Sequence, residues 1–543
     1  MFVLSLPPRF PLRFLIALAL GALHAAAFID DAAWPIAIAA LAGIATLAAR
    51  AARDTTSWRA AFAGARAGLA FGLGWLLTGI SWIYISLHTY GEMPAPLAAM
   101  GTFLLAAYLA LYPALACAAF ALLRRRFAPQ AAASSSASIA AFSALWALSE
   151  IGRGFVFTGF PWLASGYAQV GGPLAGYAPW LGVYGVSFAA ALVAATLTAA
   201  AGGMGRGEHP RAWVALLLIV GVPLAGVRLA RIEWSKPFGA PISVRLLQGN
   251  IAQDVKFVAA RFDETAELYL KLIEARRADL IVLPETAFPK FLSDLPDRVT
   301  ERLVRAAHTA HAAIAFGVPI AEGGERYFNS VIAIVPAASP DPPFSAAGRE
   351  STQRYDKSHL VPFGEFIPFG FRWFVNLMKM PLGDFTRGAS DQKPMLLAGN
   401  KVAFNICYED LFGEEIIRQA GEANILINVS NVAWFGHSMA LPQHLAISRM
   451  RAIETARPML RATNTGMTAA IDPHGRVTSQ LAPFTSGALD TSVQGMQGAT
   501  PYIRFGNAPI LVLIAALLGA AIAATRRRHG ARDSGGIRTI DLS

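Results

Sequence analysis

Three segments of this sequence place a reactive side chain beside an apolar run of strand length or an aromatic turn. Glu285 closely follows the apolar run LIVL, Lys357 stands in YDKSHLVPFGE, and Cys407 stands in NICYED. Each alone has an ordinary explanation: a helix cap or surface acid, a solvated loop with a Lys–Glu pair, and a thiol packed in the core. Together they supply a base, a cation and a thiol nucleophile, which are the groups needed for acyl transfer through a cysteine.

The expected roles follow from the chemistry of each group. A thiol becomes a strong nucleophile when a base takes its proton, and Glu285 is the expected base for Cys407. Lys357 supplies positive charge where an oxyanion develops, and Glu365 holds Lys357 in place and keeps it charged. His359 is expected to be structural, because no metal-ligand spacing accompanies it. The sequence has no serine-hydrolase elbow, phosphate loop or zinc pattern, so neither a metal nor a cofactor is predicted.

The elements that must position these side chains alternate strands with helices. Apolar runs that end in polar residues predict strands within residues 242–251, 278–289, 312–320, 327–336, 401–410 and 423–430. Helical patterns lie between several of them, at residues 263–277, 297–311, 414–420 and 441–457. This alternation predicts a layered α/β domain, in which function collects at strand ends and in the loops that follow them.

The remainder of the chain is more apolar than a soluble enzyme. Of 543 residues, 55% are hydrophobic and 15% are charged, where soluble proteins carry about 25% charged residues. This composition excludes a disordered chain, a nucleic-acid-binding arm and a plain cytosolic enzyme, and two cysteines exclude a disulfide scaffold. Cys117 lies in an apolar run and is expected only to pack.

Apolar stretches predict membrane helices near residues 12–28, 34–49, 67–86, 97–123, 134–151, 180–202, 212–230 and 508–525.

The distribution of charge predicts an orientation. Residues 1–240 carry a net charge of +8, residues 526–543 carry +3, and the block between them is neutral. Arginines fall in alternate connections, which places those connections and both termini in the cytoplasm. A cleaved N-terminal signal peptide is the alternative, but its loss would disturb this alternation. We therefore predict a membrane domain at 1–230, an external catalytic domain at 231–507, a final membrane helix at 508–525 and a cytoplasmic tail at 526–543.

With these motifs the sequence resembles the nitrilase superfamily, whose members share a Glu–Lys–Cys triad. The segment YDKSHLVPFGEFIP, with membrane helices on both sides, is similar to the apolipoprotein N-acyltransferase family. The similarity extends to TGFPWLASGY (158–167), QGNI (248–251) and NVAWFG (431–436). It implies an αββα sandwich joined to a polytopic α-helical domain in a bacterial inner membrane, with the catalytic domain on the periplasmic side.

The resemblance also implies an activity and its substrates. A fatty acyl chain would pass from a phospholipid, with phosphatidylethanolamine the expected donor, to Cys407 as a thioester. It would then pass to the α-amino group of the diacylglyceryl-cysteine that begins a lipoprotein, which is the last step of lipoprotein maturation. The partners would be these lipids and apolipoproteins, with no nucleic acid, and the enzyme would be a monomer.

Further residues match positions that the family uses around its site. Glu365, Tyr408 and Glu409 are expected to support the triad. The candidate substrate-binding residues are aromatic: Trp162, Phe257, Phe363 and Trp434. Phe257 stands where relatives have a tryptophan, so an aromatic ring is kept. The apolar segment Phe363–Met380 predicts a mobile amphipathic arm over the site, with an ordinary packed loop as the alternative.

Two other functions are compatible with parts of this pattern. A membrane-anchored amidase of the nitrilase type would use the same triad to hydrolyse a C–N bond, with water as the acceptor. Seven predicted helices before residue 231 exceed what a simple tether requires, which favours a lipid substrate. A transporter or a scaffold would not require Glu285, Lys357 and Cys407 together, and few charged residues lie within the predicted membrane helices.

Overall fold

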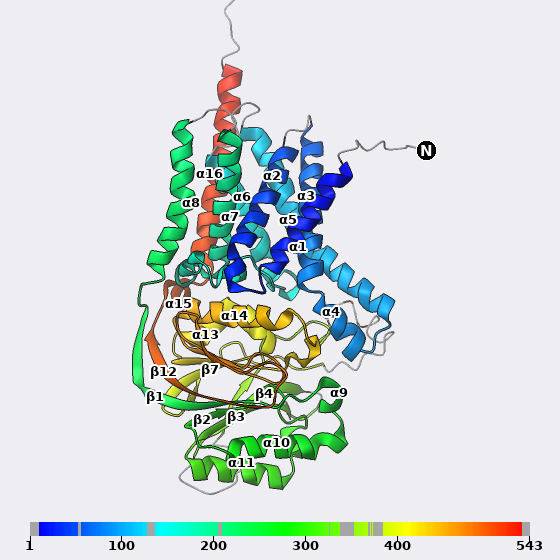
Figure 1. The fold of residues 1–543 in the computed structure, drawn as a ribbon, viewed down its shortest axis with the longest axis vertical. Coiled ribbons are helices and arrows are strands. Elements are labelled where there is room, and N and C mark those ends of the chain that lie inside the picture. The colour runs from blue at the N-terminus through cyan, green and yellow to red at the C-terminus, as the bar shows by residue number, and fades with distance from the viewer. Residues whose placement is uncertain are drawn as a thin grey trace, which may run out of the picture.

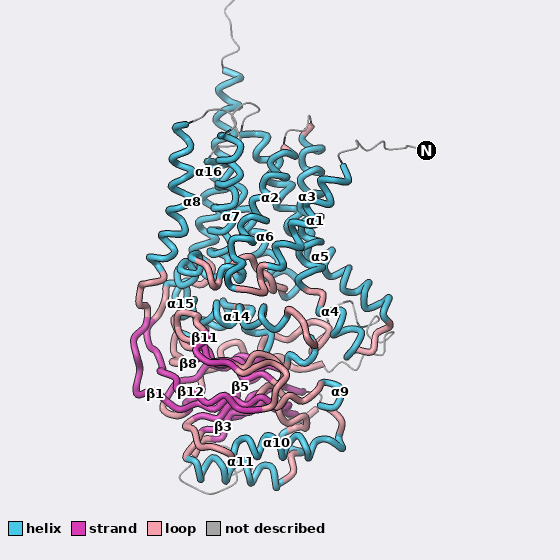
Figure 2. The backbone as a smooth tube through the Cα atoms, in the orientation of Figure 1, coloured by secondary structure: helices cyan, strands magenta, loops and turns pink. Residues whose placement is uncertain are grey.

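The computed structural model describes residues 10–52, 56–127, 136–204, 209–324, 326–336, 352–367, 370, 372 and 384–534. They form two parts, a bundle of helices and an α/β region that lies against one end of the bundle (Figure 1). Figure 2 shows the strands gathered in two layers of the α/β region. This division confirms the predicted combination of a helical membrane part and a two-sheet α/β part.

The long apolar helices lie where the hydrophobic stretches predicted them. They are α1 (Phe10–Ala26), α2 (Trp34–Ala51), α3 (Ser57–Gly79), α5 (Ala95–Phe127), α6 (Ser136–Phe155), α7 (Ala178–Met204), α8 (His209–Leu229) and α16 (Ala508–Ser534). Among the described residues, the five spans that include α2, α3, α5, α6 and α7 are long and apolar enough to cross a membrane. The apolar parts of α1, α8 and α16 are shorter, so a total of eight membrane spans stays a prediction.

Both ends of one predicted helix were wrong. The hydrophobic stretch 67–86 predicted a continuous helix, but α3 begins at Ser57 and ends at Gly79. Its first turns hold Arg59 and Arg66, so hydropathy did not mark them as helical. The Gly79 carbonyl accepts hydrogen bonds from the indole of Trp82 and from the side-chain amide of Gln443, both at 3.1 Å. These donors cap the helix, and the chain continues as α4 (Trp82–Ile85) and a π-helical turn (Ser86–Tyr90) beside the α/β region.

The uncharged stretch after α6 contains a buried non-helical segment. Residues 159–177 form turns and short 3₁₀ helices, most of them buried, before α7 begins. The N-terminal end of α1 and the C-terminal end of α16 lie at the end of the bundle remote from the α/β region (Figure 1). The C-terminal end of α2 and the N-terminal end of α3 lie at that same end (Figure 1).

Two six-stranded sheets form the centre of the α/β region. The first has the order β12-β1-β2-β3-β4-β5, and the second has the order β11-β10-β9-β8-β7-β6. The strands of the first are β1 (Ser235–Gln248), β2 (Leu280–Val282), β3 (Ala313–Ala321), β4 (Tyr327–Ile334), β5 (Thr352–Asp356) and β12 (Gly487–Gly498). Those of the second are β6 (Met395–Leu397), β7 (Asn400–Ile406), β8 (Ile425–Ser430), β9 (Met459–Thr463), β10 (Ala469–Ile471) and β11 (Val477–Gln480).

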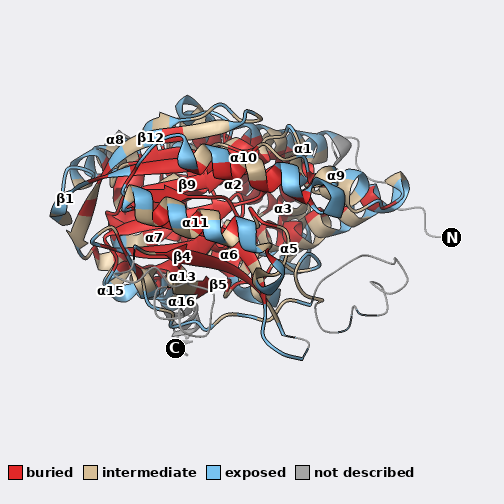
Figure 3. Ribbon diagram, turned by 90° about the horizontal axis from the view of Figure 1, so that it is seen from below, coloured by how far each residue is buried: buried red, intermediate tan, exposed pale blue. Residues whose placement is uncertain are grey.

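Helices cover both outer faces of the paired sheets. Helices α10 (Phe262–Glu274) and α11 (Asp297–Ala310) cover the outer face of the first sheet, as Figure 3 shows from below. Helices α13 (Gly413–Ala420) and α14 (Ala440–Thr455) cover the second sheet and lie between it and the bundle (Figure 1). The layers are therefore helix, sheet, sheet, helix, which is the predicted αββα sandwich with one helical layer packed on the membrane part.

The core explains this arrangement. Apolar side chains from both sheets, such as Leu246, Val282 and Ile427, are buried in one cluster between the sheets. A separate cluster joins α14 to the membrane helices and includes Tyr408 and Met450. Because α14 is apolar on the side that faces the bundle, this second cluster runs without a break from the membrane helices into one helical layer of the α/β region.

Candidate active site

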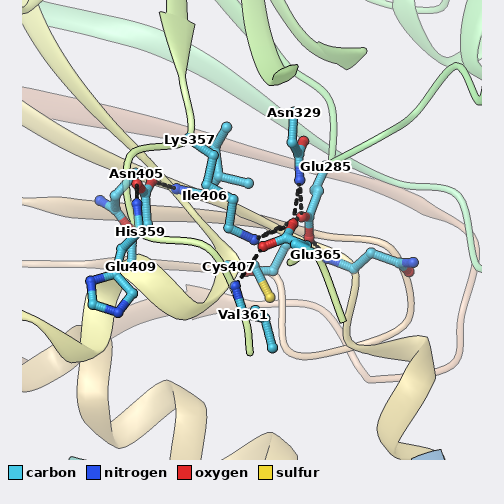
Figure 4. Close-up of polar contacts among 12 residues, drawn as sticks. Glu285, Asn329, Lys357, His359, Val361, Glu365, Asn405, Ile406, Cys407 and Glu409 are labelled. Atoms are coloured by element: carbon cyan, nitrogen blue, oxygen red, sulfur yellow. Dashed lines mark hydrogen bonds and ion pairs between the residues drawn. The ribbon is translucent and has the colours of Figure 1, made fainter. Parts of the chain in front are cut away.

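Glu285, Lys357 and Cys407 come together where three strands end (Figure 4). Glu285 follows β2, Lys357 directly follows β5, and Cys407 directly follows β7. Strands β2 and β5 belong to one sheet and β7 to the other, so both sheets contribute to the site. Cys407 has a φ of 53° and begins a 3₁₀ turn. This left-handed conformation turns the chain sharply and presents the thiol at the edge of the sandwich.

The Glu285 carboxylate is buried and held on both oxygens. Its Oε1 accepts a hydrogen bond from Asn329 Nδ2 at 2.8 Å and lies 3.5 Å from Lys357 Nζ. Its Oε2 accepts from the main-chain N–H of Asn431 at 2.8 Å. Burial opposes ionisation, but Lys357 and these donors outweigh it and lower the pKa of Glu285 below its ordinary value. The carboxylate is therefore charged at neutral pH and is able to accept a proton.

Lys357 is an enclosed cation between two acids. Its side chain is 1% exposed, and its Nζ lies 2.8 Å from Glu365 Oε1. Burial opposes the charge, but Glu365 and Glu285 raise the pKa of Lys357 above its ordinary value. Glu365 is fixed in turn by Asn329 Nδ2 at 2.9 Å and by the main-chain N–H of Val361 at 2.9 Å. The ammonium therefore stays charged and points toward the same space as the thiol (Figure 4).

Cys407 lies beside these charges as a protonated thiol. Burial raises its pKa, Glu285 raises it further, and Lys357 acts in the opposite direction. The Cys407 carbonyl accepts from Asn428 Nδ2 at 3.1 Å and lies 3.3 Å from His444 Nε2. A thiol that keeps its proton at neutral pH requires a base to become a nucleophile, and the Glu285 carboxylate is the adjacent base.

Glu409 joins the loop that carries the cation to the loop that carries the thiol. Its Oε1 accepts from the main-chain N–H groups of Ser358 at 2.6 Å and His359 at 3.0 Å. Its Oε2 accepts from the main-chain N–H of Ile406 at 2.7 Å and from the Tyr355 hydroxyl at 3.0 Å. One buried side chain therefore fixes the spacing between the residues next to Lys357 and those next to Cys407. The His359 ring stacks on the Phe412 ring, and its Nδ1 lies 3.1 Å from Glu415 Oε1. These contacts are those expected of a structural histidine.

The nucleophile loop also touches the membrane part. The Tyr408 hydroxyl donates to the Gly159 carbonyl at 2.9 Å, in the buried segment between α6 and α7. In the same segment Trp162 is 1% exposed, and its indole N–H donates to Gln443 Oε1 at 2.8 Å. Trp162 is thus enclosed between the bundle and α14, and its contact with substrate stays a prediction.

Three of the predicted substrate-binding aromatics are exposed. Phe257, Phe363 and Trp434 are 59%, 37% and 38% exposed, and their contacts with substrate remain predictions. The Trp434 carbonyl accepts a hydrogen bond from the Ser86 hydroxyl at 2.7 Å. This bond links the segment that carries Trp434 to the π-helical turn after α4. Most of the predicted arm 363–380 lies outside the described residues.

The sequence patterns did not indicate a role for several polar residues of the site. Asn329 lies within β4 and bridges Glu285 and Glu365. Lys256 ends the short helix α9 (Gln253–Lys256), and its Nζ donates to the Glu285 carbonyl at 3.1 Å. Asn431 begins the motif NVAWFG, but the motif alone did not indicate its contact with the base. Within the described ranges, no group of three His, Cys, Asp or Glu side chains is placed to bind a metal ion.

The sequence matches known families in both parts of the chain. Residues 243–502 match the model of the carbon–nitrogen hydrolases, and residues 20–196 match the N-terminal domain model of the apolipoprotein N-acyltransferases. The α/β part is therefore a nitrilase-type domain built on a membrane part of a specific kind. The chain belongs to the apolipoprotein N-acyltransferase family.

Two relatives that match nearly the whole chain support this assignment. The apolipoprotein N-acyltransferase of Ralstonia nicotianae is 49% identical over 536 residues, which cover 96% of each chain. That of Bordetella bronchiseptica is 44% identical and covers 94% of this chain and 97% of the relative. Among solved structures, an amidase from Nesterenkonia sp. is 16% identical, with a TM-score of 0.36, and the match covers 51% of this chain and 97% of that structure.

The chain is therefore a membrane-bound acyltransferase with a carbon–nitrogen-hydrolase domain. The alternative of a membrane-anchored amidase is not favoured, because the helical part matches the acyltransferase family as well. The transporter and scaffold alternatives are not favoured for the same reason, since the relatives match along both parts of the chain.

Proposed function

We propose that this enzyme moves a fatty acyl chain from a phospholipid to the N-terminal amine of a diacylglyceryl-lipoprotein through a thioester on Cys407. The observation that carries the proposal is the meeting of Glu285, Lys357 and Cys407 (Figure 4), next to a residue, Tyr408, that is hydrogen-bonded to the membrane part. Both substrates have lipid tails, so their reacting groups lie at the surface of a bilayer. A thiol fixed next to the membrane helices is in the right place to meet them.

The first half-reaction forms the acyl-enzyme. Glu285 takes the thiol proton, and the Cys407 sulfur attacks the carbonyl carbon of the phospholipid ester. The resulting oxyanion is stabilised by the Lys357 ammonium. When this intermediate collapses, the C–O bond breaks, Glu285 returns the proton to the departing alkoxide, and a lysophospholipid leaves.

The second half-reaction passes the acyl group to the amine. The neutral α-amino group attacks the thioester carbonyl, and Lys357 again stabilises the oxyanion. Glu285 takes a proton from the attacking nitrogen, the C–S bond breaks, and the Cys407 thiolate regains that proton. The product is an N-acylated lipoprotein, and the enzyme returns to its starting state. No cofactor enters either half-reaction.

The proposed setting is a bacterial inner membrane. The catalytic domain, residues 231–507, lies on the periplasmic side as a monomer, and both termini are cytoplasmic. The arrangement in Figure 1 supports this orientation, because both chain ends lie at the end of the bundle remote from the α/β region. The start of α3 and the end of α5 carry arginines, which favour the cytoplasm. Phosphatidylethanolamine is the proposed donor.

Intact-protein mass spectrometry tests the central intermediate. The purified full-length enzyme is incubated with phosphatidylethanolamine vesicles and no acceptor. We expect an added fatty-acyl mass that maps to Cys407, is released by hydroxylamine, and appears together with lysophospholipid. Cys407→Ala should abolish the adduct and Cys117→Ala, a matched change of a buried cysteine remote from the site, should preserve it.

Two outcomes would contradict the proposal. An adduct that persists in Cys407→Ala, or is lost in Cys117→Ala, would overturn the assignment of the nucleophile. Absence of both the adduct and lysophospholipid with the wild-type enzyme would count against a phospholipid donor. Release of ammonia from small amides under the same conditions would then favour the amidase alternative.

A further inference from the structure

A second buried lysine lies against the base. Lys256 ends α9 and is 4% exposed. Its Nζ donates to the main-chain carbonyl of Glu285 at 3.1 Å. An ammonium has three N–H donors. Among the described residues, the Glu285 carbonyl is the one acceptor with which Lys256 Nζ forms a hydrogen bond. Burying an ammonium with so little compensation is unfavourable, so a purely structural role explains this buried charge poorly.

The charge of Lys256 acts on the same carboxylate as Lys357. The charged or titratable groups around Glu285 are Lys357 and Glu365 from the loop after β5, Cys407 from the turn after β7, and Lys256 from α9. Both lysines lower the pKa of Glu285, whereas burial raises it. Burial lowers the pKa of Lys256 itself to about 8, with Glu285 and Cys407 opposing that change. At neutral pH the site therefore holds two cations.

We propose that Lys256 is a positioning residue of the acyl-transfer reaction, which fixes the main chain of Glu285 and keeps its carboxylate ionised beside the thiol. The inference rests on the proposed role of Glu285 as the base for Cys407. Lys357 is already paired with Glu365 at 2.8 Å and lies farther, at 3.5 Å, from Glu285. A second cation therefore offsets the burial that would otherwise protonate the base.

Two substitutions separate the charge from the hydrogen bond. Lys256→Gln removes the charge but keeps a donor for the Glu285 carbonyl, and Lys256→Met removes both. Lys271→Met is the matched control, because that lysine is 72% exposed on α10. The rate of acyl-enzyme formation with phosphatidylethanolamine vesicles is measured from mildly acidic to mildly alkaline pH. Thermal unfolding of each variant reports its fold.

The expected result is a displacement of the acid limb of the pH–rate profile. Without the cation, the pKa of Glu285 rises, so less carboxylate is present as pH falls. Both variants should therefore lose rate more severely at acidic than at neutral pH, by about tenfold on the acid limb if that pKa rises by about one. Lys256→Met should show an additional loss at all pH values, and Lys271→Met should follow the wild type. Acid limbs at the wild-type position in both Lys256 variants would overturn the proposal, whatever the size of a uniform loss.

Alkylation of Cys407 by iodoacetamide supplies a second readout that needs no lipid. Loss of the nearby cation destabilises the thiolate, so alkylation at neutral pH should be slower in Lys256→Gln than in Lys271→Met. If the wild type forms no acyl-enzyme, the proposed function fails while this measurement still tests the lysine. Equal alkylation rates would then reject the role of Lys256.

Discussion

Asn329 provides the most demanding test of the site, because its side-chain amide joins both acids. Its Nδ2 donates to Glu285 Oε1 at 2.8 Å and to Glu365 Oε1 at 2.9 Å. The substitution Asn329→Asp keeps the size of the side chain and removes both N–H donors. The main-chain carbonyl of Asn329, which accepts from the Lys357 N–H at 2.8 Å, is unchanged. The perturbation is therefore confined to the two hydrogen bonds and to the carboxyl group that replaces the amide.

The magnitude follows from these distances. An ionised carboxylate about 3 Å from each acid would be repelled by about 5–6 kcal/mol per pair at an effective dielectric constant of about 20. The new carboxyl group therefore binds a proton instead. Its single O–H donor serves one acid, so the other acid loses one of its hydrogen bonds. Loss of one hydrogen bond to a charged group costs about 1.5–3 kcal/mol, which predicts a rate of acylation about 10- to 150-fold lower.

The assay is the rate of thioester formation on Cys407, followed by intact mass across a range of pH. The deficit should increase toward acidic pH, because loss of the donor raises the pKa of Glu285 and protonates the base. Asn424→Asp is the control, since Asn424 is also buried and hydrogen-bonded but lies away from the site. A folded Asn329→Asp enzyme with the wild-type rate throughout would refute the reasoning.

Other substitutions test the remaining contacts. Lys357→Met should lower the acylation rate about 100- to 1,000-fold through loss of the oxyanion cation, without altering lipid binding measured by co-sedimentation. Glu409→Gln should leave at least one main-chain N–H unpaired, lowering the free energy of unfolding by about 1–3 kcal/mol in denaturation and slowing acylation. Gly317→Ala should displace Glu285, because a Cβ at this position would lie 2.7 Å from its Cα and 2.4 Å from the next main-chain N, and thioester formation should fall while Cys407 alkylation persists.

The reactive residues could be predicted because Glu285 and Cys407 end apolar runs. A buried strand of apolar residues must end at a sheet edge, so a polar side chain at that point is placed by the pattern alone. The strand before Lys357 gave no such signal, since β5 reads TQRYD and is an edge strand of mixed polarity. Its lysine was found through its motif rather than through the strand that carries it.

The supporting residues depend on contacts that sequence patterns do not encode. Asn329 stands next to Ser330 in the mainly apolar strand β4 and pairs with acids that are distant in the chain. Lys256 stands in the short segment QDVK, which resembles a solvated helical turn. The end of α3 at Gly79 depends on Gln443, which belongs to α14. Tertiary contacts decide each of these cases, whereas hydropathy decides the order of helices and strands.

The long pairing of β1 with β12 has a consequence for how the protein is made. Ser235 pairs with Gly498, and Gln248 pairs with Gly487, so the first strand of the α/β part is completed by the last. A ribosome releases β1 long before β12, and until then one edge of β1 lacks its native partner. Unpaired edges favour misassembly of nascent chains. The sheet can close only when the chain has been synthesised nearly to α16, so maturation of the catalytic fold is a late event in biogenesis.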